Sequence, residues 1–350
     1  KQLNFILENT PASQNIMLVG KHGIGKSRIL EEYFAAKNQK VVTLFLGQMS
    51  DPGDLIGLPE KNENTGKTDF MLPYWFPTDG KPVVLFLDEL NRARPEVLQT
   101  IMDLTLNKKL AGKSLPKGSR IISAVNNGSE YQLTDLDPAL VSRFNIYEFE
   151  PTVEDWLIWA EASNIDCRVI NFISDNPELL DASDLQNDSE NLERSPDRRS
   201  WERTSDVIKN FETLSDLQKP LVSGIIGNRV TSLFFRYVME HNIPSASSIL
   251  LNDFESVQKT LKSLSFTDFT QINISLFRFI ESSNYKESQK SKIAENLILY
   301  FEFLQNNSSR EIQSHFSSLL NADDYPKTLV FISNMAPTLY EEIMQFIMNL

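Results

Sequence analysis

One segment near the start of the chain has the residue types and spacing of a phosphate-binding loop. Its sequence fits the pattern G-x-x-x-x-G-K-[ST]. Glycines in such a loop let the backbone curl so that its N–H groups point at the phosphates, while Lys26 reaches the β- and γ-phosphates and Ser27 binds Mg²⁺. The pattern therefore predicts a bound nucleoside triphosphate. The expected binding residues are Gly20, Lys21, His22, Gly23, Ile24, Gly25, Lys26, Ser27 and Arg28. Within this set we interpret His22 as an exposed loop residue rather than a catalyst.

Two adjacent acids, Asp88 and Glu89, follow the apolar run 83–87. Carboxylates at the end of a buried strand need a cation or a polarised water to compensate them. With the phosphate loop upstream, Asp88 is expected to hold Mg²⁺ and Glu89 to activate the attacking water. A simpler alternative is that both acids favour the N-terminus of a helix opened by Pro95.

The first 150 residues alternate short apolar runs with amphipathic segments, which predicts a parallel sheet between helices in an α/β fold. Helices are expected at 27–36, after the phosphate loop, and at 95–106, where Pro95 suits the first helical position. The expected strands, rich in β-branched residues and Leu, cover residues 15–19, 41–46, 83–87, 121–125 and 146–149.

Beyond Pro151 the strand pattern fades and helical patterns continue to the end of the chain. Residues Ile293, Leu297, Phe301 and Leu304 have helical spacing and are expected to lie in a core. The acidic segment 181–196 is expected to be a solvated loop. We therefore predict a nucleotide-binding domain over 1–150, an α-helical lid over 151–245 and a further helical block over 246–350.

Composition narrows the classes of protein. The 350 residues carry a net charge of −13, which argues against general binding to a nucleic-acid backbone. A lone cysteine, Cys167, and three scattered histidines make a zinc cluster or a Cys/His nucleophile pair improbable. The chain shows neither an apolar run of roughly 18 residues nor a signal-peptide pattern, so we expect a cytoplasmic protein without a membrane partner.

The stretch Leu87-Asp88-Glu89-Leu90-Asn91-Arg92-Ala93 resembles the D-E-[IL]-N-R-A motif of MoxR-like AAA+ ATPases. The resemblance covers residues from about 10 to 235. It implies an AAA+ P-loop NTPase core followed by a helical lid, ATP and Mg²⁺ as cofactors, and assembly into a homo-oligomeric ring, expected to be a hexamer. The family also implies an insertion that begins at 51–59 and a hairpin at 110–118, and both are candidates for contact with a substrate.

The same resemblance implies three further functional residues. The strand 121–126 ends at the sensor 1 position, where Asn126 is chosen and Asn127 is its rival. Residues 136–144 resemble L-x-P-A-L-x-x-R-F, which makes Arg143 the arginine finger that acts on the nucleotide of a neighbouring subunit. An element similar to P-R-[ST]-W-E makes Arg199 sensor 2, with Arg198 as a rival.

The favoured hypothesis is a ring-forming ATPase that couples hydrolysis to the remodelling of a protein partner, which by resemblance carries a von Willebrand A domain. The alternative is an NTPase motor of a nucleic-acid-processing or restriction-type system that uses GTP, which the acidic composition disfavours. A monomeric kinase would leave the Arg143 element unexplained. A scaffold that binds nucleotide without turnover would leave Glu89 without a role.

Overall fold

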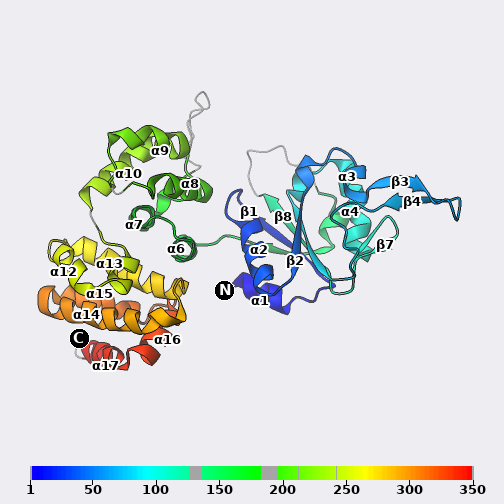
Figure 1. Ribbon diagram of the computed structural model, residues 1–350. Coiled ribbons are helices and arrows are strands. Elements are labelled where there is room, and N and C mark those ends of the chain that lie inside the picture. Colours follow the sequence, from blue (N-terminus) through cyan, green and yellow to red (C-terminus); the bar gives the residue numbers. More distant parts are fainter. Residues whose placement is uncertain (1, 127–135, 183–194, 212, 242, 349–350) are drawn as a thin grey trace. The chain divides into compact units, whose positions relative to one another are not determined.

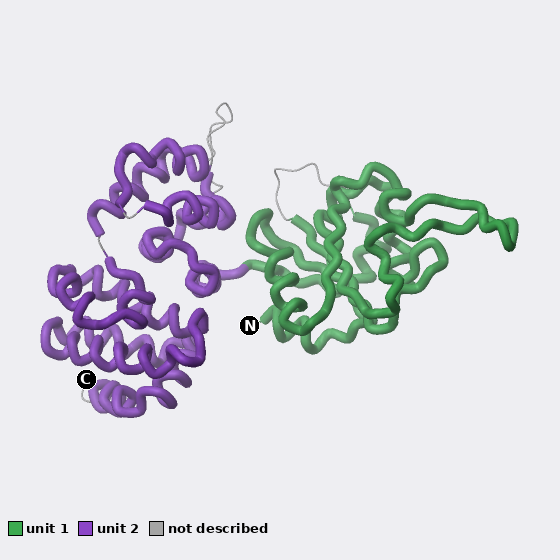
Figure 2. Tube along the Cα trace, viewed as in Figure 1, with its two compact units in different colours: residues 1–150 green, residues 151–350 purple. Residues whose placement is uncertain are grey.

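The computed structural model describes residues 2–126, 136–182, 195–211, 213–241 and 243–348. The chain forms two compact units, residues 1–150 and residues 151–350 (Figure 2). The finer division of the second unit at residue 245 stays a prediction.

Unit 1 is built on a five-stranded parallel sheet with the strand order β2-β5-β8-β1-β9 (Figure 1). This confirms the predicted α/β fold with a parallel sheet. The predicted strand positions differ from the observed ones by one or two residues at their ends. The strands are β1 (Asn15–Gly20), β2 (Lys40–Phe45), β5 (Val83–Asp88), β8 (Arg120–Asn126) and β9 (Phe144–Glu148).

Successive side chains of the strands serve two different cores, because they point to opposite faces of the sheet. Ile16, Leu18 and Phe86 belong to a hydrophobic cluster on one face. Met17 and Leu87 belong to a second cluster on the other face. The strands are apolar throughout because both faces are covered, as is usual for parallel sheets.

Helices cover both faces of the sheet. On one face lie α1 (Gln2–Asn9) and α2 (Lys26–Ala36), which contribute buried residues such as Leu7 and Phe34. On the other lies α4 (Pro95–Asn107), whose apolar positions include Ile101. Helix α4 begins with proline at its first turn and is followed by Lys108 in a left-handed conformation, which are usual start and stop signals.

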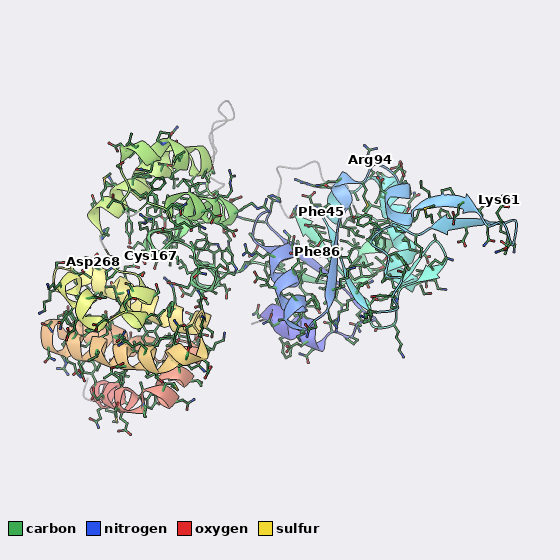
Figure 3. All side chains as sticks on the ribbon, in the orientation of Figure 1. Phe45, Lys61, Phe86, Arg94, Cys167 and Asp268 are labelled. Carbon is green, nitrogen blue, oxygen red and sulfur yellow. The ribbon has the colours of Figure 1, made fainter. Side chains whose placement is uncertain are left out.

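Two hairpins lie beside the sheet of unit 1. The first follows the short helix α3 (Gly53–Ile56) and pairs β3 (Leu58–Lys61) with β4 (Thr68–Met71). Lys61 lies far out on this hairpin (Figure 3). The second pairs β6 (Lys109–Leu110) with β7 (Lys113–Ser114). A hairpin was expected over 110–118, whereas only the start of an insertion was expected over 51–59.

Unit 2 is helical in its described residues. One hydrophobic cluster gathers residues between 156 and 235, and another gathers residues between 246 and 343. The predicted stripe of Ile293, Leu297, Phe301 and Leu304 is fully buried in α14 (Lys290–Asn307), which confirms its core role. Most of the segment 181–196 lies outside the described residues.

The main helices of unit 2 are α6 (Val153–Ala162), α7 (Cys167–Asp175), α8 (Arg198–Ile208), α9 (Lys219–Ile226), α10 (Asn228–Glu240), α11 (Ala246–Leu251), α12 (Phe254–Leu261), α13 (Phe266–Ser282), α14 (Lys290–Asn307), α15 (Arg310–Leu319), α16 (Pro326–Met335) and α17 (Pro337–Met348). In the described part of the chain, none of the helices combines the length and the apolar character needed to cross a membrane.

Candidate nucleotide-binding site

The phosphate loop connects the end of β1 to the start of α2, and its glycines occupy positions that other residues would not tolerate. Gly25 directly precedes α2 with φ of 92°, and Gly23 has φ of 78°. A Cβ atom at Gly20 would lie 2.4 Å from the carbonyl oxygen of Phe149. The loop therefore follows a path that requires glycine at these places and ends at the N-terminus of an eleven-residue helix, where anions are favoured.

Lys26 lies beneath this loop with only 5% of its surface exposed. Its Nζ donates hydrogen bonds to the carbonyl oxygens of Gly20 (2.9 Å) and Lys21 (2.8 Å) and to Oδ1 of Asn126 (2.8 Å). Burial lowers the pKa of Lys26 to about 8, and the nearby Asp88 and Glu89 oppose this shift. The three acceptors satisfy the ammonium group geometrically, but none of them carries a charge.

Ser27 and Asp88 meet at the end of β5. The Ser27 hydroxyl donates to Oδ2 of Asp88 at 3.0 Å, and Oδ1 of Asp88 accepts from the backbone N–H of Glu89 at 2.9 Å. A hydroxyl and a carboxylate oxygen at this distance are hard ligands that suit Mg²⁺ when phosphate and water complete its shell. In the residues that the structure describes, no group of three or more His, Cys, Asp or Glu could hold a metal by itself.

Glu89 adopts a left-handed conformation (φ 56°) that turns the chain out of the sheet. Its Oε1 forms an ion pair with Nη1 of Arg92 at 2.6 Å, and both side chains are largely buried. Gly47 leaves room for this pair, because a Cβ there would lie 3.0 Å from Oε2 of Glu89. Sequence reasoning missed Arg92 as a partner of Glu89, although a basic residue three positions after an acidic residue is a signal for such an ion pair.

Asn126 is brought to the phosphate loop by the sheet register. It ends β8 directly beside Gly20 of β1, and its side chain accepts from Lys26. The residue is 5% exposed. Its rival for the sensor 1 position, Asn127, lies outside the described residues.

The remaining loop residues differ in what they can offer a ligand. Lys21 and His22 are exposed, as expected for His22. Ile24 packs against the hydrophobic cluster of α1 and α2. Arg28 is exposed on α2 and forms an ion pair with Glu32 at 3.0 Å. Their predicted contacts with nucleotide stay predictions.

Arg143 does not lie with the loop. It immediately precedes β9, whose first residue pairs with Asn15 at the start of β1, and the phosphate loop begins at the far end of β1. A strand of that length spans roughly 16 Å. The Arg143 guanidinium donates to the carbonyl oxygen of Met102. The sheet therefore keeps Arg143 and the phosphate loop of the same chain at opposite ends of β1.

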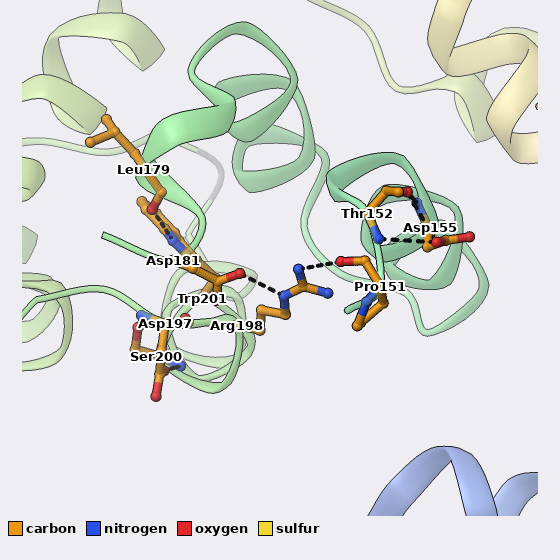
Figure 4. A network of polar contacts seen from close by, with 9 residues as sticks. All are labelled: Pro151, Thr152, Asp155, Leu179, Asp181, Asp197, Arg198, Ser200 and Trp201. Atoms are coloured by element: carbon orange, nitrogen blue, oxygen red, sulfur yellow. Dashed lines mark hydrogen bonds and ion pairs between the residues drawn. The ribbon is translucent and has the colours of Figure 1, made fainter. Parts of the chain in front are cut away.

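Arg198 and Arg199, the two candidates for sensor 2, are the first two residues of α8 but have different surroundings. Arg198 is 9% exposed, and it pairs with Asp181 at 2.9 Å and donates to the carbonyl oxygen of Pro151 at 2.7 Å (Figure 4). Arg199 is exposed. Arg198 is thus occupied by structural contacts, and the role of Arg199 stays a prediction.

Comparison with known proteins finds a family and a relative that are similar to part of the chain. Residues 15–144 match the AAA domain of the dynein-related subfamily. A curated relative from Thauera aromatica, named "Putative chaperone BssE", is 30% identical over 141 residues, which cover 38% of this chain and 49% of the relative. The chain thus spans about half the length of that relative.

Solved structures similar to this chain include a RuvB variant from Thermotoga maritima, with a TM-score of 0.38 and 14% identity over 82% of this chain and 80% of that one. Another is NtrX from Brucella abortus, with a TM-score of 0.37 and 14% identity over 84% and 67% of the two chains.

The strand order and the match over residues 15–144 define the class of unit 1. Its fold is that of an AAA+ P-loop NTPase core, as predicted.

Proposed function

We propose that this protein is a Mg²⁺-dependent ATPase of the MoxR-like AAA+ type that assembles into a homo-oligomeric, hexameric ring and uses hydrolysis to remodel a protein partner. The observation that carries the proposal is a pair of hydrogen bonds at the carboxyl ends of the parallel strands, between Lys26 and Asn126 and between the adjacent Ser27 and Asp88. These are the side-chain types that phosphoryl transfer from a nucleotide requires.

Each residue of the site then has a defined task. Lys26 exchanges its carbonyl contacts for the β- and γ-phosphate oxygens. Mg²⁺, held by Ser27 and Asp88, would neutralise charge on those phosphates. Glu89 accepts a proton from the water that attacks the γ-phosphorus, while the bond to the bridging oxygen breaks and ADP departs. Asn126 orients this water and the γ-phosphate.

Arg143 is proposed to act on the nucleotide of a neighbouring subunit. Its position at the sheet edge opposite to its own loop supports this role, because roughly 16 Å separate the two ends of β1. A guanidinium placed against the γ-phosphate of the next subunit would neutralise charge that develops during transfer. The ring would then be a requirement of the chemistry.

Two observations support the proposal of a protein partner. The relative with 30% identity carries the name of a chaperone, and the MoxR-like motif suggests a partner with a von Willebrand A domain. We place this activity in the cytoplasm. Arg199 completes the proposed set as the residue that senses nucleotide from the helical lid.

Replacing Glu89→Gln tests the proposed reaction. ATP affinity should stay within about threefold of the wild type, while turnover falls about 10²- to 10⁴-fold because the general base is lost. Glu96→Gln, the same change at an exposed position of α4, is the matched control and should leave turnover unchanged. Undiminished hydrolysis in Glu89→Gln would remove Glu89 as the base. A wild-type protein that hydrolyses no nucleoside triphosphate would refute the function itself.

Mixing two inactive variants tests the shared site. Lys26→Ala subunits keep Arg143, and Arg143→Ala subunits keep an intact phosphate loop, so a mixed ring should recover part of the ATPase. The control replaces the first partner with Lys26→Ala/Arg143→Ala, which supplies neither group and should recover nothing. No recovery in rings shown to contain both single variants would argue against a site completed by a neighbour.

A further inference from the structure

Strand β8 extends past its neighbour β5 just where the candidate site begins. The last paired residues of the two strands are Leu87 and Ser123. Strand β5 then ends at Asp88, and Glu89 turns the chain into the short 3-10 helix η2 (Leu90–Arg92). Strand β8 continues to Asn126, so the backbone of Asn126 has no β5 residue opposite it.

The side chain of Asn91 takes the place of that missing strand. Its Nδ2 donates to the carbonyl oxygen of Asn126 at 3.0 Å, and its Oδ1 accepts from the backbone N–H of Asn126 at 3.5 Å. A carboxamide carries one acceptor and two N–H donors on a planar group, so it can mimic a peptide unit of a neighbouring strand. Asn91 is 3% exposed, which keeps water from competing for these bonds.

Asn91 thereby holds Asn126, whose side chain contacts Lys26 of the phosphate loop. The Asn126 side chain accepts from Lys26 at 2.8 Å, and its backbone lies beside Gly20. If the backbone of Asn126 shifted or rotated, its amide would leave Lys26 and the position expected for the γ-phosphate. Displacements of about 1 Å in a catalytic arrangement can reduce rates about a hundredfold.

We propose that Asn91 is a positioning residue for ATP hydrolysis, which acts by clamping the backbone of Asn126. The inference rests on the proposed function. It also explains why the residue two positions after Glu89 is an amide: the turn that ends β5 carries Glu89 and the clamp for Asn126 on one short segment. The contact between Asn91 and Asn126, which lie 35 residues apart in sequence, thereby links the segment that carries the base to the amide that orients the water.

The sharpest test is Asn91→Asp, which keeps the size of the side chain but sets a carboxylate oxygen against the carbonyl of Asn126. We expect kcat to fall about 10- to 100-fold. Affinity for ADP should stay within about threefold, because ADP lacks the γ-phosphate that Asn126 is proposed to orient. Asn306→Asp, at an exposed position of α14 in unit 2, is the control for the added charge and should change neither quantity.

A double-mutant cycle separates positioning from a general structural role. Asn126→Ala removes the amide that Asn91 is proposed to aim, so adding Asn91→Asp to it should lower kcat by no more than about twofold. Losses that multiply across the two sites would overturn the inference. So would a wild-type kcat in Asn91→Asp alongside a strong loss in Asn126→Ala. If even the wild type lacks NTPase activity, it is the proposed function that fails.

A measurement on the wild type covers the case in which Asn91→Asp does not fold. Residue-resolved hydrogen exchange should find the Asn126 amide protected at a level similar to that of Ser123, although it lies past the β5 pairing. Exchange at the rate of an open loop would contradict the clamp. Asn91→Ala offers a second variant, for which the same loss of kcat and the same coupling to Asn126→Ala are expected.

Discussion

Two buried cations, Lys26 in unit 1 and Arg278 in unit 2, are stabilised in opposite ways. Lys26 donates its hydrogen bonds to neutral oxygens, and burial lowers its pKa to about 8 although the nearby charges of Asp88 and Glu89 oppose the shift. For Arg278, 5% exposed, burial also acts to lower the pKa, but the hydrogen bonds and charge of Glu154 outweigh it, so the pKa is raised. The first cation has no matched anion of its own, whereas the second does.

The contacts of Arg278 form a closed network within unit 2. Its Nε and Nη2 engage both carboxylate oxygens of Glu154, the former at 2.6 Å. Its Nη1 donates to the hydroxyl of Ser174 at 3.0 Å, and the Tyr325 hydroxyl donates to Glu154 at 2.8 Å. This network joins α6 and α7 to α13 and the segment before α16.

The difference separates a structural pair from a ligand site. A buried charge that is fully paired holds helices together, and removing one partner leaves the other uncompensated. A buried charge whose hydrogen-bond acceptors are all neutral keeps its electrostatic attraction for an incoming anion. Lys26 therefore suits a phosphate, and Arg278 suits a fixed interface between helices.

The largest expected effect is on the stability of unit 2. Arg278→Met should lower its free energy of unfolding by about 3–5 kcal/mol, because Glu154 and Ser174 lose a buried partner. Lys292→Met, which breaks an exposed pair with Glu295, should cost less than about 1 kcal/mol. Denaturant unfolding of both variants measures the contrast. Equal losses would mean that burial does not distinguish these pairs.

Lys26→Met should weaken nucleotide binding strongly and change stability little, which is the reverse of the expectation for Arg278→Met. Affinity for ATP should fall about 10- to 150-fold, since charged hydrogen bonds contribute about 1.5–3 kcal/mol. The free energy of unfolding of unit 1 should change by less than about 1 kcal/mol, because the lost contacts are offset by removing a buried charge. Titration calorimetry and unfolding curves report the two quantities. A strongly destabilised protein would place Lys26 with Arg278 as a structural cation.

The smallest expected effect is on the uptake of a proton when the nucleotide binds. Bound triphosphate favours the charged form of Lys26 and raises its pKa above about 8. At pH 8.5 the free protein has mostly neutral Lys26, so binding should take up most of a proton, whereas at pH 7 it should take up little. Calorimetry in buffers of different ionisation enthalpy measures this uptake.

Lys26→Arg is the control for this measurement, since a guanidinium stays protonated at both values of pH. Its binding of ATP should show no extra uptake at pH 8.5. Equal uptake by the wild type at pH 7 and pH 8.5 would assign the proton to another group.

Local patterns in the sequence were enough to predict much of unit 1. Apolar runs marked the strands, and the spacing of Gly20, Gly25 and Lys26 marked the loop between β1 and α2. Buried strands and glycine turns are imposed by the side chains of a few neighbouring residues, so a short window contains the signal. The apolar stripe of α14 was predictable for the same reason.

Only the tertiary structure decided which distant groups meet. It pairs Arg278 with Glu154 and Arg198 with Asp181, so that Arg198 is buried while its neighbour Arg199 is exposed. It also brings the side chain of Asn91 into hydrogen bonds with the backbone of Asn126. The sequence by itself determined that a phosphate loop, an acidic strand end and an amide strand end are present. Their contacts depend on sheet register and on helix packing across many residues, and no local pattern encodes these.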